Sequence, residues 1–238
     1  KLVSWLLVKL EKMLCERIKL LVVTSEYFYS KFYKDVVDAS KMLFIPNTPD
    51  PKVFNGFKRK KNKIYTIGFI GAVRYAKQIE MLIDAAELKG INVFIAGKGI
   101  DSQRIEKYAK DKGFVQIYGE YQYEKEIRSL YERVDCIYSV YDANMKNVQI
   151  ALPNRLYEAV YTKTPIIAAK DTYLGELVEK YKIGKTIEHE SMNDLIGAIE
   201  ELRFNDDLVK IIKSNLAILK DKWVLERYNK KLLDAINT

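Results

Sequence analysis

Apolar strand-like segments alternate with helical segments over most of this 238-residue chain. The first, IYTIGFIGAV at 64–73, is almost continuously apolar, which is typical of a strand buried on both faces of a parallel sheet. Helical segments separate it from further strand-like segments at 91–99, 114–119, 135–141, 164–169 and 185–189. This alternation predicts an α/β fold with a doubly wound, Rossmann-like parallel sheet.

The candidate functional residues all follow predicted strands. They lie in the segments 71–77, 97–99, 118–121 and 141–158. Right-handed crossovers bring the carboxyl ends of parallel strands to one edge of the sheet, and ligands bind in the crevice there. We therefore expect one binding site at this edge.

Composition narrows the classes of function. An apolar fraction of 48% is ample for a buried core, and the net charge of +8 suits anionic ligands. Five of the six residues in KRKKNK, 58–63, are basic, and we expect this segment to be a solvated linker. The chain lacks the interleaved aromatic and basic residues of RNA-binding modules and any DNA-recognition motif, so we expect no nucleic-acid partner.

Cysteine and histidine are scarce. Cys15 and Cys136 lie far from any CxxC pattern, which indicates reduced thiols of an intracellular protein. The single histidine, His189, lies in a polar loop where we expect it to be solvated. A His-rich metal centre and a Ser-His-Asp set are therefore excluded.

The first 55 residues differ from the rest. Residues 1–19 have a helical period with apolar Leu2, Leu6 and Leu10, but too many charges for a membrane span. This helix either packs on a sheet or lies on a membrane surface. Strand-like segments follow at 20–25 and 42–45, with a predicted helix at 25–36. Because the first residue is Lys and not Met, we expect either a piece of a longer chain or a start that precedes the printed sequence.

The segment GAVRYAK, 71–77, has features of a phosphate site. Gly71 allows the backbone to approach a ligand closely, and Arg74 and Lys77 near a helix N-terminus can neutralise phosphate oxygens. The glycine spacing matches neither a P-loop nor a GxGxxG dinucleotide motif. In contrast, we expect Gly97 and Gly99 to serve a tight turn with close packing.

The segment ALPNRLYEAVYTKTPIIAA, 151–169, carries the strongest signal. Asn154 is a suitable N-cap, so the following amides and Arg155 could hold a pyrophosphate, with Leu156 contributing its amide. Glu158, one turn later, could accept hydrogen bonds from a ribose diol. Alternatively, Glu158 points away from the face shared by Leu156 and Val160 and is simply solvated. Tyr121, after another strand, could offer its ring to a base, although a plain turn explains it equally well.

The order of these segments resembles the C-terminal half of a GT-B glycosyltransferase of the group 1 (family 4) type. The resemblance covers about 15–225, and four segments carry it: TIGFIGAVRYAKQIEMLIDAA, VFIAGKG, VQIYGEYQYEKEIRSLYERVDCIYSV and ALPNRLYEAVYTKTPIIAA. It implies three parts: the end of an N-terminal acceptor-side domain with the hinge, a nucleotide-sugar donor-binding domain, and a C-terminal helix that crosses back, at 1–55, 56–221 and 222–238.

The resemblance also implies the function. It is that of a retaining, hexosyltransferase-type enzyme of bacterial surface polysaccharide or glycan synthesis, using a nucleoside-diphosphate sugar, a glycan or lipid-linked acceptor, and neither cofactor nor metal. Lys77 and Arg74 would be catalytic by stabilising the leaving group. The donor-binding residues would be Gly71, Asn154, Arg155, Leu156, Glu158, Tyr121 and Asn147. The implied location is the cytoplasm, with peripheral association with the inner membrane left open.

The carboxylate pattern of the family is incomplete here. Its Glu-x7-Glu pair has Ile150 at the first position, so the carboxylate for the donor sugar is absent. Asn144, Asn147 or the amides near Pro153 are the candidates to replace it.

Two other positions depart from the family. Ala72 occupies the place of a phosphate-binding arginine, and Arg74 is the candidate substitute. Lys163 occupies the place of a helix-ending glycine, at a cost of about 1 kcal/mol if it adopts a left-handed conformation.

Three other functions stay open at this point: a sugar-nucleotide epimerase on the same architecture, a catalytically silent nucleotide-sugar-binding module or subunit, and a basic nucleic-acid binder. Because only two strand-like segments precede residue 55, we expect an incomplete enzyme. Such a chain would bind donor without acceptor-dependent transfer.

Overall fold

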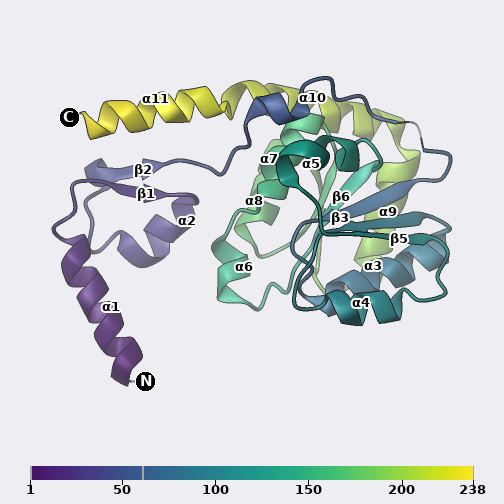
Figure 1. Ribbon diagram of the computed structural model, residues 1–238, viewed down its shortest axis with the longest axis horizontal. Coiled ribbons are helices and arrows are strands. Elements are labelled where there is room, and N and C mark those ends of the chain that lie inside the picture. The colour runs from purple at the N-terminus through teal and green to yellow at the C-terminus, as the bar shows by residue number, and fades with distance from the viewer. Residues whose placement is uncertain (1, 61, 238) are drawn as a thin grey trace.

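The computed structural model describes residues 2–60 and 62–237 (Figure 1). Its larger sheet is parallel throughout, in the order β5-β4-β3-β6-β7-β8. The strands are β3 (Thr66–Ile70), β4 (Asn92–Ala96), β5 (Val115–Gly119), β6 (Cys136–Ser139), β7 (Ile166–Ala169) and β8 (Gly184–Ile187). The predicted doubly wound α/β fold is confirmed.

Helices cover both faces of this sheet (Figure 1). One face carries α3 (Ala76–Lys89), α4 (Ser102–Tyr108) and α9 (Met192–Phe204). The other carries α5 (Tyr123–Tyr131), α7 (Asn154–Thr162) and α8 (Tyr173–Tyr181), with the short α6 (Lys146–Ile150) at its edge. Because both faces are covered, the strands are apolar along their whole length; Ile67, Phe69, Ile137 and Ile167 have no exposed surface.

The direction of winding reverses beside β3. The chain passes from β3 to β4 and β5 on one side, then returns to place β6, β7 and β8 on the other. The carboxyl ends of β3 and β6 are therefore neighbours from which the chain leaves in opposite directions. Such a point leaves a crevice at the sheet edge.

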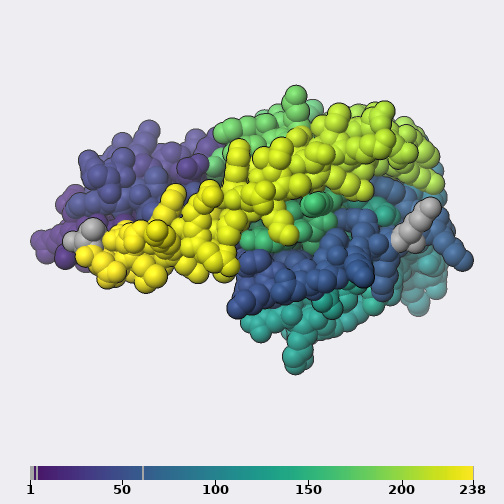
Figure 2. All heavy atoms as spheres, turned by 90° about the horizontal axis from the view of Figure 1, so that it is seen from above, coloured from purple at the N-terminus to yellow at the C-terminus, as the bar shows by residue number. Residues whose placement is uncertain are grey.

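The N-terminal segment forms a separate two-stranded parallel sheet of β1 (Leu21–Val23) and β2 (Met42–Phe44). The helix predicted at 25–36 is shorter, with α2 (Glu26–Phe28) continuing as a wider π-helical turn, Tyr29–Tyr33. From the large sheet, α10 (Asp206–Lys222) and α11 (Leu225–Ile236) run back toward this segment (Figure 2). The assignment of these parts to acceptor-side and donor-side domains stays a prediction.

The two parts are joined by aromatic rings and one buried hydrogen bond. The rings of Tyr27 and Tyr173 stack with centroids 4.0 Å apart, and Tyr228 of α11 meets Phe44 edge-on at 6.2 Å. The buried Ser25 hydroxyl donates to the carbonyl of Ile150 in α6 at 2.6 Å. The N-terminal segment therefore contacts elements next to the sheet crevice.

Helix α1 (Leu2–Cys15) exposes apolar side chains along its length. Val3, Trp5 and Leu7 are each more than half exposed, as is Leu6 of the predicted apolar face, while Leu10 is 49% exposed. The side chain of Leu2 lies outside the described residues. None of the described helices has the length and hydropathy to cross a bilayer. Whether a sheet, a partner or a membrane surface covers α1 stays a prediction.

The basic segment 58–63 is not simply a solvated linker. Arg59 donates to the Thr162 carbonyl at 3.1 Å and to the Thr164 hydroxyl at 2.6 Å, and Asn62 donates to Asp135 at 2.9 Å. The buried ends of β6 and α7 leave oxygens that need donors, and these two side chains supply them. Lys58 and Lys60 are exposed as expected; Lys61 lies outside the described residues.

Candidate functional site

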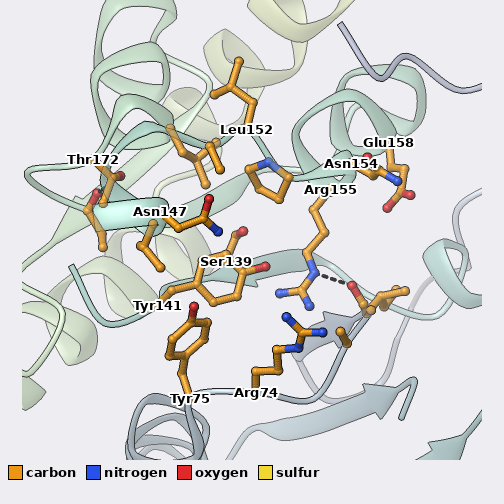
Figure 3. Close-up of a pocket in the computed structure, with 18 of the residues that line it drawn as sticks. Arg74, Tyr75, Ser139, Tyr141, Asn147, Leu152, Asn154, Arg155, Glu158 and Thr172 are labelled. Carbon is orange, nitrogen blue, oxygen red and sulfur yellow. Dashed lines mark hydrogen bonds between the residues drawn. The ribbon is translucent and has the colours of Figure 1, made fainter. Parts of the chain in front are cut away.

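A pocket of about 460 Å³ opens at the carboxyl ends of β3, β6 and β7, beside the N-terminus of α7 (Figure 3). This is the edge of the sheet where the sequence predicts a site. Its volume lies within the range of small-ligand sites. The pocket brings together seven of the predicted site residues: Gly71, Arg74, Tyr121, Asn147, Asn154, Arg155 and Glu158.

Arg155 joins the two strands at the floor of the pocket. Its Nε donates to the carbonyl of Ile70 at the end of β3, and its Nη1 donates to that of Tyr138 in β6 at 3.3 Å. The guanidinium also lies over the ring of Phe69, 3.9 Å from the centroid. Arg155 is 4% exposed, and no carboxylate among the described residues lies within 4.0 Å of it. A buried positive charge without an anionic neighbour favours an anionic ligand.

Gly71 keeps the backbone low enough for this arginine. A side-chain carbon at position 71 would come within 2.9 Å of Arg155 Nη2, and φ there is +129°. Gly97, on the neighbouring strand, faces the Gly71 carbonyl so closely that an added carbon would lie 2.0 Å from it. The predicted packing role of Gly97 is confirmed, and Gly71 serves both the packing and the pocket surface.

Arg74 provides a second cation at the pocket rim. Figure 3 shows its guanidinium turned toward that of Arg155. The next residue, Tyr75, has φ 63°, a left-handed conformation that is uncommon for a bulky side chain and clusters at functional sites. Its ring lies 5.4 Å from that of Tyr141, so the two tyrosines form an aromatic wall beside the arginines.

Glu158 is buried, so the alternative of a solvated carboxylate is wrong. Its side chain is 3% exposed, and Tyr131 donates to Oε2 at 2.8 Å. Burial raises the pKa of Glu158; hydrogen bonds from Tyr131 and Tyr123 and the charge of Arg155 oppose this rise. Burial and the Glu158 charge raise the pKa of Tyr121 to about 12, so this tyrosine is neutral at physiological pH. A buried carboxylate held by two phenols is a preorganised acceptor for ligand hydroxyls.

Two predicted site residues lie outside the pocket lining as described. Lys77 is exposed on the first turn of α3, and Leu156 is fully buried in the core. The amide of Leu156 already donates to the Pro153 carbonyl at 3.1 Å. The predicted N-cap is shifted by one residue: Pro153 occupies that position, and Asn154 begins the helix with its side chain at the pocket.

The side of the pocket opposite Glu158 is formed by α6 and the start of α8. Helix α6 has no counterpart in the sequence prediction, and it carries Asn147 and Val148 into the lining. Nearby, His189 is not solvated as expected. It is 16% exposed, lies 3.3 Å from Asp142 and contacts the Asn144 amide at 3.1 Å. These contacts fix the loop that leads into α6.

The titratable groups of this site do not form a metal cluster. Within residues 2–60 and 62–237, no three or more His, Cys, Asp or Glu side chains gather closely enough to hold an ion. Cation chemistry at the pocket therefore rests on Arg74 and Arg155 among the described lining residues. The expectation that no metal or cofactor is needed stays a prediction.

The family model for glycosyl transferases group 1 matches residues 52–216, which include every strand of the large sheet. The chain belongs to this family. The match confirms the resemblance seen in the Gly71–Lys77 and Ala151–Ala169 segments. A search of curated proteins gave no significant match.

Solved structures share the fold. TarM from S. aureus, crystallised with UDP, fondaparinux and alpha-GlcNAc-glycerol, has 22% identity and a TM-score of 0.73, with 94% of this chain and 45% of TarM covered. HepE from Anabaena, with UDP and glucose, has 14% identity and a TM-score of 0.78, with coverage of 97% and 66%. Sucrose-phosphate synthase from Thermosynechococcus elongatus has 18% identity and a TM-score of 0.74, with coverage of 97% and 60%. The chain thus spans about half to two thirds of these proteins.

Proposed function

We propose that this chain is the donor-binding part of a retaining, hexosyltransferase-type glycosyltransferase that uses a nucleoside-diphosphate sugar. One observation carries the proposal: two arginines and a buried carboxylate converge in one pocket where the strand order reverses. Arg74 and Arg155 suit a diphosphate, and Glu158 suits a ribose diol. UDP in the TarM and HepE structures supports the choice of ligand class.

The arginines would also assist the chemistry. When the sugar leaves the diphosphate, negative charge grows on the leaving phosphate, and cations already in place lower the barrier. Lys77, on the first turn of α3, would supply a further charge by swinging toward the diphosphate. This arrangement needs no metal ion. We further propose a cytoplasmic enzyme of bacterial polysaccharide or glycan synthesis that acts on a glycan or lipid-linked acceptor at or near the inner membrane.

The alternatives differ in what the pocket must contain. An epimerase needs acid–base groups beside the sugar, whereas Glu158 is the one carboxylate among the described lining residues, and its partners are tyrosines. A silent binding module would bind donor without turnover. Measuring release of sugar from UDP-glucose, GDP-mannose, ADP-glucose and dTDP-glucose, alone and with glycan acceptors, separates these functions.

The first prediction tests the diphosphate contacts by calorimetry. Arg74→Ala and Lys77→Ala should weaken binding of the preferred nucleoside diphosphate about tenfold or more, because a charge-assisted contact is lost. Binding of the matching nucleoside should change little, since it lacks the negative charge. Lys58→Gln with Lys60→Gln is the control; both lysines are exposed, and their removal should leave affinity intact. Equal losses for nucleoside and diphosphate would refute the assignment.

A further inference from the structure

Ser139 ends β6 and lines the pocket, yet its hydroxyl has no hydrogen-bond partner among the described residues. The residue has no exposed surface. Figure 3 places it beside Tyr141 in the middle of the pocket, near the two arginines. A polar group in this position is unusual, because the rest of β6 is apolar or aromatic.

An unpartnered buried hydroxyl costs free energy that an apolar residue of similar size would not cost. The neighbouring strand shows the apolar alternative, since Ala168 is in register with Ser139. Buried hydroxyls in folded proteins nearly always have a partner. The missing partner at Ser139 is therefore a group that arrives with the ligand.

The surroundings limit which part of a ligand that group belongs to. Thr172 also lines this side, but its hydroxyl is already used, donating to the Ala169 carbonyl at 2.8 Å and accepting from the Gly175 amide at 3.0 Å. The remaining lining here combines the Asn147 amide with apolar side chains: Val148, Ala151, Leu152 and Leu174. This surface is uncharged and suits a sugar, which has hydroxyls and apolar ring faces.

We propose that the Ser139 hydroxyl forms a hydrogen bond with an oxygen of the donor's sugar. The inference rests on the proposed function. With the diphosphate between Arg74 and Arg155, Glu158 lies on one side of it and Asn147 on the other (Figure 3). Glu158 then takes the nucleoside, and Ser139 with Asn147 takes the sugar. Ser139 thus replaces part of the polar contact that a carboxylate would make at position 150, which is Ile150 here.

The experiment compares Ser139→Ala with the unchanged chain by calorimetry. UDP, GDP, ADP and dTDP are titrated first, followed by UDP-glucose, GDP-mannose, ADP-glucose and dTDP-glucose. Ser139→Ala should bind the preferred nucleotide sugar about five- to tenfold more weakly, the effect of one lost neutral hydrogen bond, and bind the diphosphate as before. Its melting temperature should stay equal or rise, because the orphaned hydroxyl is gone.

Tyr157→Phe is the matched control. Tyr157 also buries an unpartnered hydroxyl, but its ring packs 5.5 Å from Trp223 and lies outside the described pocket lining. Its removal should affect stability alone. Equal affinity of Ser139→Ala and the unchanged chain for the nucleotide sugar would overturn the role of Ser139 while leaving the proposed function intact. Failure of the unchanged chain to bind any of these nucleotides would overturn the proposed function, and this inference with it.

Discussion

Glu158 shows what could and could not be predicted for a single residue. Its position on a helix after a strand follows from the sequence, and so does its candidate role. A helical wheel nevertheless places it opposite Leu156 and Val160, as if in solvent. In the structure all side chains from Arg155 to Thr162 are buried, because α7 is covered on its outer side as well. A wheel that assumes one covered face fails for such a helix, and only the tertiary arrangement supplies Tyr131 as partner.

The buried carboxylate gives a second prediction, on pH. Because its folded pKa is raised, Glu158 favours the folded state fully below the usual pKa of 4.5 and loses that contribution as pH rises through the folded value. Glu158→Gln cannot ionise and still accepts from Tyr131. At neutral pH it should melt higher than the unchanged chain and bind nucleotide about tenfold or more weakly. Thermal melts across acidic to neutral pH, together with calorimetry, measure both effects.

Glu126→Gln is the control for this experiment. Hydrogen bonds from Tyr118 and the Gln122 amide lower the pKa of Glu126, so its contribution has the opposite sign: present above its usual pKa and lost as pH falls. This variant should not melt higher at neutral pH, and it should bind nucleotide normally. A Glu158→Gln chain with unchanged nucleotide affinity would return Glu158 to a purely structural role.

Secondary-structure elements were predictable where one pattern persists over many residues. Each strand of the large sheet follows from a continuous apolar segment, because burial on both faces demands it. Helix α6 was missed because its five residues are too few to establish a helical period. Arg59 was misassigned for a related reason: a run of cations resembles a linker, and the oxygens of Thr162 and Thr164 that it binds are distant in sequence.

The end of α7 gives the third prediction, because the expected strain is present. Lys163 caps this helix with φ 51° and ψ 42°, a left-handed conformation that glycine adopts more readily. Lys163→Gly should raise the free energy of unfolding by about 0.5–1 kcal/mol in urea titrations. Lys125→Gly, inside α5, should instead lower it by about 1 kcal/mol. A loss of stability in both variants would mean that the Lys163 side chain contributes more than its backbone strain costs.

At the scale of the whole molecule, the link between the two sheets could not be predicted. Both participants in the Ser25–Ile150 hydrogen bond are ordinary in sequence and 125 residues apart. This bond holds α6, which brings Asn147 and Val148 to the pocket. A helix of five residues has little stability of its own, so α6 depends on such outside contacts. The N-terminal segment can therefore influence donor binding without touching the donor.

Removing that bond is the last prediction. Ser25→Ala should speed hydrogen exchange of the amides at 146–151 and weaken binding of the nucleotide sugar several-fold, while the central strands stay protected. Ser25→Thr keeps the hydroxyl and should restore both properties. Tyr33→Phe removes a bond of 2.8 Å to Glu11 within the N-terminal segment and should leave residues 146–151 unaffected. If exchange at 146–151 is the same in Ser25→Ala as in the unchanged chain, α6 is held by its contacts with the large sheet alone, and the N-terminal segment has no control over the pocket.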